Sequence, residues 1–209
     1  FRPHGCIRLK SDKANVMKKI LFILCMMVSL FTKAQPAAPK TALLIIDIQN
    51  FYFAGGSSEL VDPVPASLNA QKMLSYFRQS GQLVIHIKHG DGKGAEIHPN
   101  VAPADGEKVI VKNEVNSFLK TDLLEYLQKN QVKKLVLCGM QTNMCLEAAT
   151  RAAADLGFEC VVIHDACAAK NQVFNGRTVS AADVHAAALA TLKAYASIVS
   201  TDAYLESGK

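Results

Sequence analysis

Apolar runs alternate with amphipathic stretches along the chain from residue 41 onward. The short apolar runs are rich in Val, Ile and Leu, as expected of strands buried on both faces of a sheet. Between them, apolar residues recur at helical spacing, and glycines such as Gly81 and Gly157 mark helix ends. The predicted strands cover 41–48, 83–88, 108–112, 134–138, 160–164 and 196–200, and the predicted helices cover 66–79, 121–129, 144–156 and 181–195.

This alternation predicts a single-domain α/β protein. Strands that alternate with helices form right-handed crossovers, so the expected architecture is a three-layer Rossmann-like fold: a parallel six-stranded sheet with helices on both faces. Open sheets of this kind bind ligands at the carboxyl ends of their strands. The longest irregular segment, 90–107, is rich in glycine and proline and belongs on that rim. Loops of this length in compact domains are usually functional or disordered.

The N-terminal part of the chain reads as a targeting segment. Met17 is followed by two lysines, an apolar run from Ile20 to Phe31, and a small-residue exit that ends at Ala34. This order predicts a secretory signal peptide over 17–34 and export to the periplasm or the medium. A membrane anchor would need about 20 apolar residues. We therefore expect upstream sequence before Met17, a single domain over 35–209, and no membrane association after cleavage.

Removal of this segment changes the charge balance. Residues 1–34 hold seven of the 23 Lys and Arg but one of the 18 Asp and Glu. The remaining chain thus carries 16 basic against 17 acidic residues, a net charge of −1. A nucleic-acid partner would need a basic face, so we expect none.

Four cysteines remain after residue 34: Cys138, Cys145, Cys160 and Cys167. An even number in an exported protein is compatible with disulfides. Cys138 and Cys160, however, lie inside apolar runs, where a free cysteine behaves as a small buried hydrophobe. The sequence therefore favours buried free thiols, and a Cys138–Cys160 disulfide is kept as an alternative.

Three reactive residues stand where predicted strands end. Asp47 closes the first strand, Lys112 closes the third, and Cys145 follows the fourth. Thr142 or Asn143 is a natural N-cap, which places Cys145 in the first turn of a helix. The helix dipole and a nearby ammonium favour a thiolate, so the pKa of Cys145 is expected to fall below its free value of about 8.5. Asp47 would then accept the thiol proton, and backbone N–H groups of the turn would hold an oxyanion.

Several motifs together resemble one known family, the isochorismatase-like cysteine hydrolases, which include nicotinamidases and related amidohydrolases. The resemblance covers about residues 41–202. It rests on Asp47-Ile48-Gln49-Asn50-Phe51, on Lys112 with Ser117-Phe118, on Gly139-Met140-Gln141-Thr142-Asn143-Met144-Cys145-Leu146, on Thr150-Arg151-Ala152-Ala153, on Leu156-Gly157 and on Asp165-Ala166-Cys167-Ala168.

The resemblance implies a set of site residues. It implies a catalytic triad, a covalent thioester-type intermediate, a small-molecule substrate, no cofactor and a homo-oligomer. The residues so implied are Asp47, Lys112 and Cys145 as the triad, a cis peptide at Met140–Gln141, an oxyanion hole of the Gln141 and Cys145 N–H groups, and substrate contacts from Gln49, Phe118 and Asn143.

The histidines depart from the nicotinamidase pattern. That branch carries a metal site spelled Asp-x-His after the second strand, whereas this chain has His86-Ile87-Lys88-His89 there. His86 and His89 lie on opposite faces of a strand, and zinc needs three or four converging ligands. The pattern therefore predicts structural or solvated histidines and no metal, with His98 in the long loop facing substrate or solvent.

The leading hypothesis is hydrolysis of a carbon–nitrogen bond in a small amide through an acyl-Cys145 intermediate. Two alternatives stay open. One is vinyl-ether hydrolysis of the isochorismatase type, which does not require a cysteine. The other is a catalytically silent binding domain, which would be favoured if Asp47, Lys112 and Cys145 failed to converge.

Overall fold

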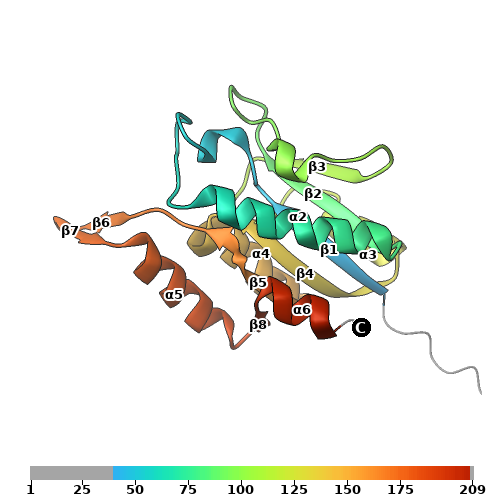
Figure 1. The fold of residues 1–209 in the computed structure, drawn as a ribbon. Coiled ribbons are helices and arrows are strands. Elements are labelled where there is room, and N and C mark those ends of the chain that lie inside the picture. The colour runs from blue at the N-terminus through green and yellow to red at the C-terminus, as the bar shows by residue number, and fades with distance from the viewer. Residues whose placement is uncertain (1–39, 208–209) are drawn as a thin grey trace, which may run out of the picture. The chain divides into compact units, whose positions relative to one another are not determined.

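The computed structural model describes residues 40–207, and the predicted signal peptide lies outside these residues. Six parallel strands form one sheet in the order β3-β2-β1-β4-β5-β8 (Figure 1). The strands are β1 (Lys40–Ile46), β2 (Leu83–His89), β3 (Lys108–Lys112), β4 (Val132–Met140), β5 (Glu159–Ala168) and β8 (Ser197–Val199). All six predicted strands are present.

Helices cover both faces of this sheet, as Figure 1 shows. Along β1, Leu43 and Ile45 join the apolar cluster of α2, whereas Leu44 and Ile46 join the cluster of α3 and α4 on the other face. The predicted three-layer arrangement is therefore confirmed. The helices are α2 (Pro63–Gln79), α3 (Leu123–Lys129), α4 (Glu147–Asp155), α5 (Ala181–Leu192) and α6 (Thr201–Ser207).

Short elements complete the described chain. Single turns lie at η2 (Asn50–Tyr52) and η3 (Pro99–Val101), and a π turn, η4 (Thr142–Leu146), precedes α4. An antiparallel hairpin, β6 (Gln172–Phe174) and β7 (Arg177–Val179), leads into α5. None of the helices within residues 40–207 combines the length and apolar composition needed to cross a membrane.

Several element boundaries differ from the sequence-based expectation. The helix predicted over 144–156 is split, because its first part forms η4. The last predicted helix ends at Leu192 instead of residue 195. The strand predicted to end at His164 continues to Ala168, because it pairs again with the end of β4 after a register shift. The β6–β7 hairpin and α6 were not predicted.

The four cysteines in the described part of the chain are free thiols. Cys138, Cys145, Cys160 and Cys167 are all buried and unbridged. The Cys138–Cys160 bridge that the sequence left open is therefore absent.

Candidate active site

The three predicted catalytic side chains converge at the carboxyl ends of the strands. Nζ of Lys112 lies 2.7 Å from Oδ2 of Asp47 and 3.3 Å from Sγ of Cys145. Asp47 lies directly after β1, and Lys112 ends β3, two strands away in the sheet. The long lysine side chain spans the intervening strand. The predicted convergence of the three residues is confirmed.

Backbone geometry directs Asp47 into the site. Its φ of 52° is in the left-handed region, so the chain turns sharply as it leaves β1. Its N–H still donates to the carbonyl of Ile87 on β2 at 3.0 Å. The carboxylate is therefore held by the sheet itself, on a backbone that is fixed before any ligand arrives.

Gly139 allows the end of β4 to approach β1 next to Asp47. It pairs in register with Ile46 and has a φ of +135°. A Cβ at this position would lie 1.9 Å from the carbonyl oxygen of Ile46. Since real Cβ atoms do not come so close to backbone, only glycine fits here. This approach sets the spacing between Asp47 and the turn that carries Cys145.

The Lys112 ammonium donates three hydrogen bonds. Its acceptors are Nδ1 of His89 at 3.0 Å, the carbonyl of Glu114 at 3.2 Å and Sγ of Cys145 at 3.3 Å. Oδ2 of Asp47 is closer still to Nζ, at 2.7 Å, and forms an ion pair with it. The contact of His89 with the central cation was not predicted from the sequence.

Burial governs the protonation of the site. Cys145 is 5% exposed, and burial, followed by the Asp47 charge, raises its pKa to about 12 in spite of the Lys112 ammonium. The expected low pKa was wrong, because the argument from the helix end and the lysine left out desolvation. Burial also raises the pKa of Asp47, while Lys112 opposes that rise. Cys145 is thus a thiol in the free protein, beside a carboxyl group that can take its proton.

The turn that carries Cys145 has the predicted cis peptide between Met140 and Gln141. The N–H groups of Met144 and Leu146 both donate to the carbonyl of Gln141, at 3.1 and 3.3 Å. No such backbone bond takes the N–H of Gln141 or Cys145 within the part of the chain that the structure describes. These two N–H groups remain the candidates for an oxyanion hole.

The predicted side-chain caps of this turn are not formed. Gln141 takes the N-cap position without a side-chain hydrogen bond. The hydroxyl of Thr142 instead pairs with Nδ1 of His185 on α5 at 2.9 Å. Asn143 is half-buried, and its Oδ1 has no hydrogen-bond partner among the described residues. Its predicted substrate contact stays a prediction, and an unpartnered acceptor is compatible with it.

Gln49 is fully buried and fully hydrogen-bonded to backbone. Its amide nitrogen donates to the carbonyls of His89 and Ala95, at 3.1 and 2.6 Å, and its oxygen accepts from the N–H of His89 at 2.8 Å. The side chain therefore joins the end of β2 to the 90–107 loop. Because these contacts use its polar atoms, the predicted substrate contact of Gln49 is not proposed further.

The other two predicted ligand contacts are aromatic rings placed by neighbouring rings. Phe118 is half-buried and stacks with Phe158 at 6.2 Å between centroids. His98 stacks on Phe53 at 3.7 Å, and its Nδ1 accepts from the N–H of Asn100. Their contacts with substrate stay predictions.

Tyr52 is a site residue that the sequence did not reveal. It is buried in η2, and burial, followed by the charges of Cys145 and Asp47, raises the pKa of its phenol. The Gln141 side chain also hydrogen-bonds to this phenol. In the sequence Tyr52 is one aromatic residue among three, so only the chain path after β1 shows its place.

Asp47, His89 and Cys145 also form a set of metal-ligand types. Their ligand atoms all lie within 4.8 Å of one another. However, the ammonium of Lys112 is within hydrogen-bonding or ion-pair distance of all three. A metal ion at this point would meet a fixed positive charge, so this donor set fits the lysine and not a resident metal.

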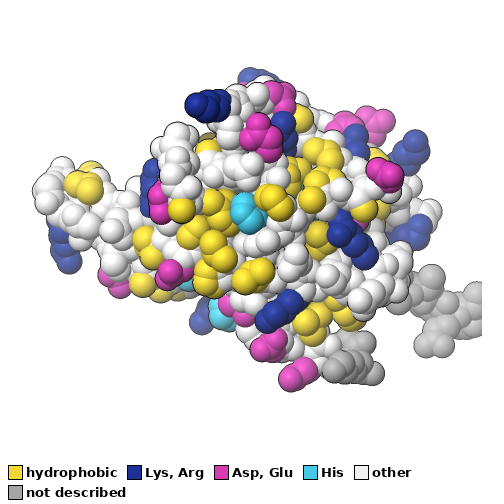
Figure 2. All heavy atoms as spheres, turned by 45° about the horizontal axis from the view of Figure 1, so that its top comes forward, with side chains coloured by type: hydrophobic (Ala, Val, Ile, Leu, Met, Phe, Trp, Pro, Cys, Tyr) yellow, Lys and Arg dark blue, Asp and Glu magenta, His cyan; other side chains and the backbone are white. Residues whose placement is uncertain are grey.

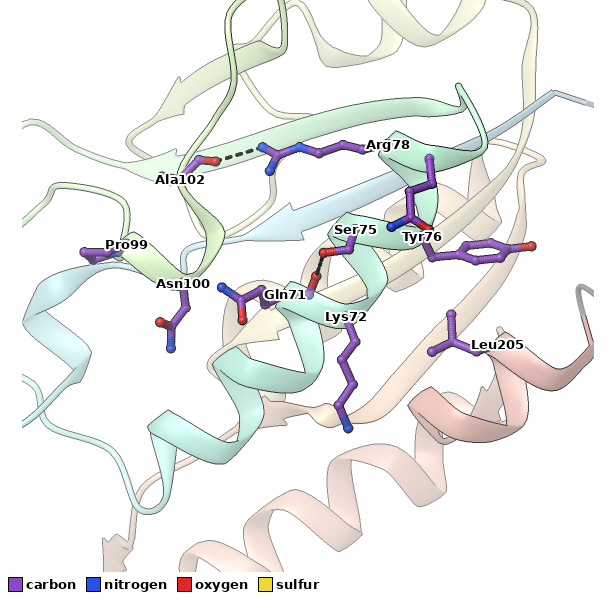
Figure 3. Close-up of a pocket in the computed structure, with 10 residues that line it drawn as sticks. Gln71, Lys72, Ser75, Tyr76, Arg78, Pro99, Asn100, Ala102 and Leu205 are labelled. Carbon is purple, nitrogen blue, oxygen red and sulfur yellow. Dashed lines mark hydrogen bonds between the residues drawn. The ribbon is translucent and has the colours of Figure 1, made fainter.

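A groove of about 650 Å³ lies elsewhere, between α2, the 99–102 segment and Leu205 (Figure 3). Arg78 on its edge donates to the carbonyl of Ala102, as the dashed line shows, and to both oxygens of Glu107. None of the triad residues lines this groove.

On the face in Figure 2, basic and acidic side chains are interspersed without a continuous basic area.

Comparison with known proteins identifies the family. A model of the isochorismatase domain matches residues 41–203. The chain belongs to the isochorismatase family. It is therefore a hydrolase of this family.

Individual relatives agree with this assignment. An isochorismatase-family protein of Bacillus subtilis, YddQ, is 43% identical, over 79% of this chain and 99% of its own length. The crystal structure of an isochorismatase hydrolase from Oleispira antarctica is 44% identical, with a TM-score of 0.79 over 83% of this chain and all of its own. A streptothricin hydrolase of Streptomyces noursei is 33% identical over 60% of this chain and 48% of that protein.

Proposed function

We propose that this isochorismatase-family hydrolase cleaves a carbon–nitrogen, amide-type bond of a small molecule through a covalent Cys145 acyl intermediate. The observation that carries this proposal is the contact of Lys112 with both Cys145 Sγ and the Asp47 carboxylate in one buried cluster. The likeness to a streptothricin hydrolase supports hydrolysis as the reaction class.

The acylation step begins with a protonated thiol. Because the pKa of Cys145 is about 12, the thiol proton moves to Asp47 as Sγ attacks the carbonyl carbon. The carbonyl electrons pass to oxygen, and the N–H groups of Gln141 and Cys145 stabilise that oxyanion. The Lys112 ammonium stabilises the charge that develops on sulfur, since it donates to Sγ.

Collapse of the tetrahedral species breaks the carbon–nitrogen bond. Asp47 returns the proton to the leaving nitrogen, and an acyl-thioester remains on Cys145. Water then attacks the thioester carbon while Asp47 takes one of its protons. The carboxylic acid leaves, and Asp47 passes the proton to Sγ, so the enzyme regains its starting state.

The alternatives are less well supported by this geometry. A silent binding domain has no need of a buried acid, cation and thiol in mutual contact. Vinyl-ether hydrolysis does not require a nucleophilic thiol, whereas Sγ of Cys145 here accepts a hydrogen bond from Lys112, which also pairs with Asp47. The amide-type reaction uses every one of these groups.

The test is a hydrolysis screen of small primary and secondary amides, nicotinamide included, read by mass spectrometry. The wild type is expected to convert at least one amide to its acid and amine. Cys145→Ala should abolish turnover, while Cys167→Ala, at a thiol that instead donates to the carbonyl of Ile163, should retain it. Turnover by Cys145→Ala equal to that of the wild type would refute the proposal.

A further inference from the structure

The three hydrogen bonds of the Lys112 ammonium are of two kinds. One goes to the reacting sulfur of Cys145, and two go to acceptors that take no part in the reaction, His89 Nδ1 and the Glu114 carbonyl. An ammonium has three N–H groups on one rotatable bond. Two fixed acceptors therefore determine where the third N–H points.

His89 is itself held firmly beside Lys112. The two residues are register partners on β2 and β3. The backbone N–H and carbonyl of His89 are both bound by the Gln49 amide, and the N–H of Gly90 donates to the Lys112 carbonyl at 2.9 Å. The imidazole is thus attached to a backbone that is hydrogen-bonded on both sides, so its Nδ1 is a well-placed acceptor.

We propose that His89 is a positioning residue that directs the Lys112 ammonium toward Cys145. Because an ammonium only donates, Nδ1 of His89 must carry the lone pair, and the imidazole proton must be on Nε2. In this tautomer His89 and the Glu114 carbonyl take two N–H groups, and the third is aimed at Sγ.

Without the His89 acceptor, the ammonium has a competing partner close by. Oδ2 of Asp47 already lies 2.7 Å from Nζ, in an ion pair. A freed N–H would turn toward this carboxylate. Donation to the sulfur would weaken, and Asp47 would become a poorer acceptor for the thiol proton.

The experiment compares His89→Asn with His89→Leu. The two side chains are similar in size, so they open the site to a similar extent, but only asparagine has an acceptor near the position of Nδ1. The first readout is the rate of Cys145 alkylation by iodoacetamide at pH 9, which requires no substrate. The second, which rests on the proposed function, is kcat and KM on an amide that the wild type hydrolyses. His164→Leu on β5 is the matched control.

A hydrogen bond to a charged group is typically strong enough that its loss changes a rate roughly 10- to 100-fold. We expect His89→Leu to be slower than His89→Asn by that factor in both alkylation and kcat, with KM little changed. His89→Asn should stay within a few-fold of the wild type, and His164→Leu should match it.

The outcomes separate this inference from the proposed function. Equal alkylation rates and equal kcat values in His89→Asn and His89→Leu would overturn the positioning role, even if the wild type hydrolyses amides. If no amide is turned over but the alkylation rates differ as expected, the positioning role stands and the proposed function fails.

Discussion

Replacement of Gly139 by alanine tests how the fold sets the spacing of the site. The added Cβ would lie 1.9 Å from the Ile46 carbonyl oxygen and 2.7 Å from its carbon. Both atoms are backbone in the centre of the sheet, so no flexible side chain can move aside. The end of β4 must therefore shift away from β1, and Cys145 moves relative to Asp47.

The size of the effect follows from two costs. A contact this close forces a backbone shift, and an alanine at a φ of +135° adds conformational strain. Together they are expected to cost about 3–5 kcal/mol of unfolding free energy. For a domain of this size that corresponds to a loss of roughly 6–20 °C in melting temperature.

Gly157→Ala provides the matched control. Gly157 also has a positive φ, 88°, but no atom lies within 4 Å of the place where its Cβ would be. Its substitution should cost about 1–2 kcal/mol from strain alone. Thermal unfolding by circular dichroism and amide turnover are measured for both variants. Equal losses of melting temperature in the two variants would refute the argument that close approach at Gly139 builds the site.

Four further outcomes are expected. Lys112→Met should lower kcat about 100-fold or more, because Cys145 loses its charged donor; a near-normal kcat would contradict the role. The pKa of Glu107 is lowered from 4.5 to about 2, chiefly by Arg78, so its contribution to stability is present above pH 4.5 and is lost as pH falls toward 2. Melting temperatures between pH 5 and pH 3 should therefore fall more for the wild type than for Glu107→Gln, and parallel curves would refute this. Protein from its native host should begin near Gln35, and sequencing that finds Met17 on most molecules would overturn export. Light scattering should give a multiple of the chain mass, whereas a monomer mass would contradict the expected homo-oligomer.

The strands and the convergence of Asp47, Lys112 and Cys145 were predictable because their signals are local. The strands coincide with short runs rich in Val, Ile and Leu, and Asp47 and Lys112 stand at the ends of two such runs. Parallel topology then brings strand ends together without further information. The β6–β7 hairpin has no such signal, since its strands have three residues each and Phe174 is 75% exposed.

The electrostatics of the site could not be predicted, because burial is a tertiary property. The helix end and the lysine led us to expect a thiolate, but desolvation, which raises the pKa of Cys145, is the largest influence on it. The alternation of side chains along a strand correctly placed His86 and His89 on different faces of the sheet. The sequence pattern does not give the pairing register between β2 and β3, which places His89 beside Lys112.

The most direct test of the central claim is the mass of the enzyme during turnover. The protein is mixed with an amide that it hydrolyses, quenched with acid within the first turnovers and digested for mass spectrometry. We predict that the peptide containing Cys145 gains the mass of the acyl group and that hydroxylamine, which cleaves thioesters, removes it. Active turnover with an unmodified Cys145 peptide, or an acyl group on another residue, would contradict the claim.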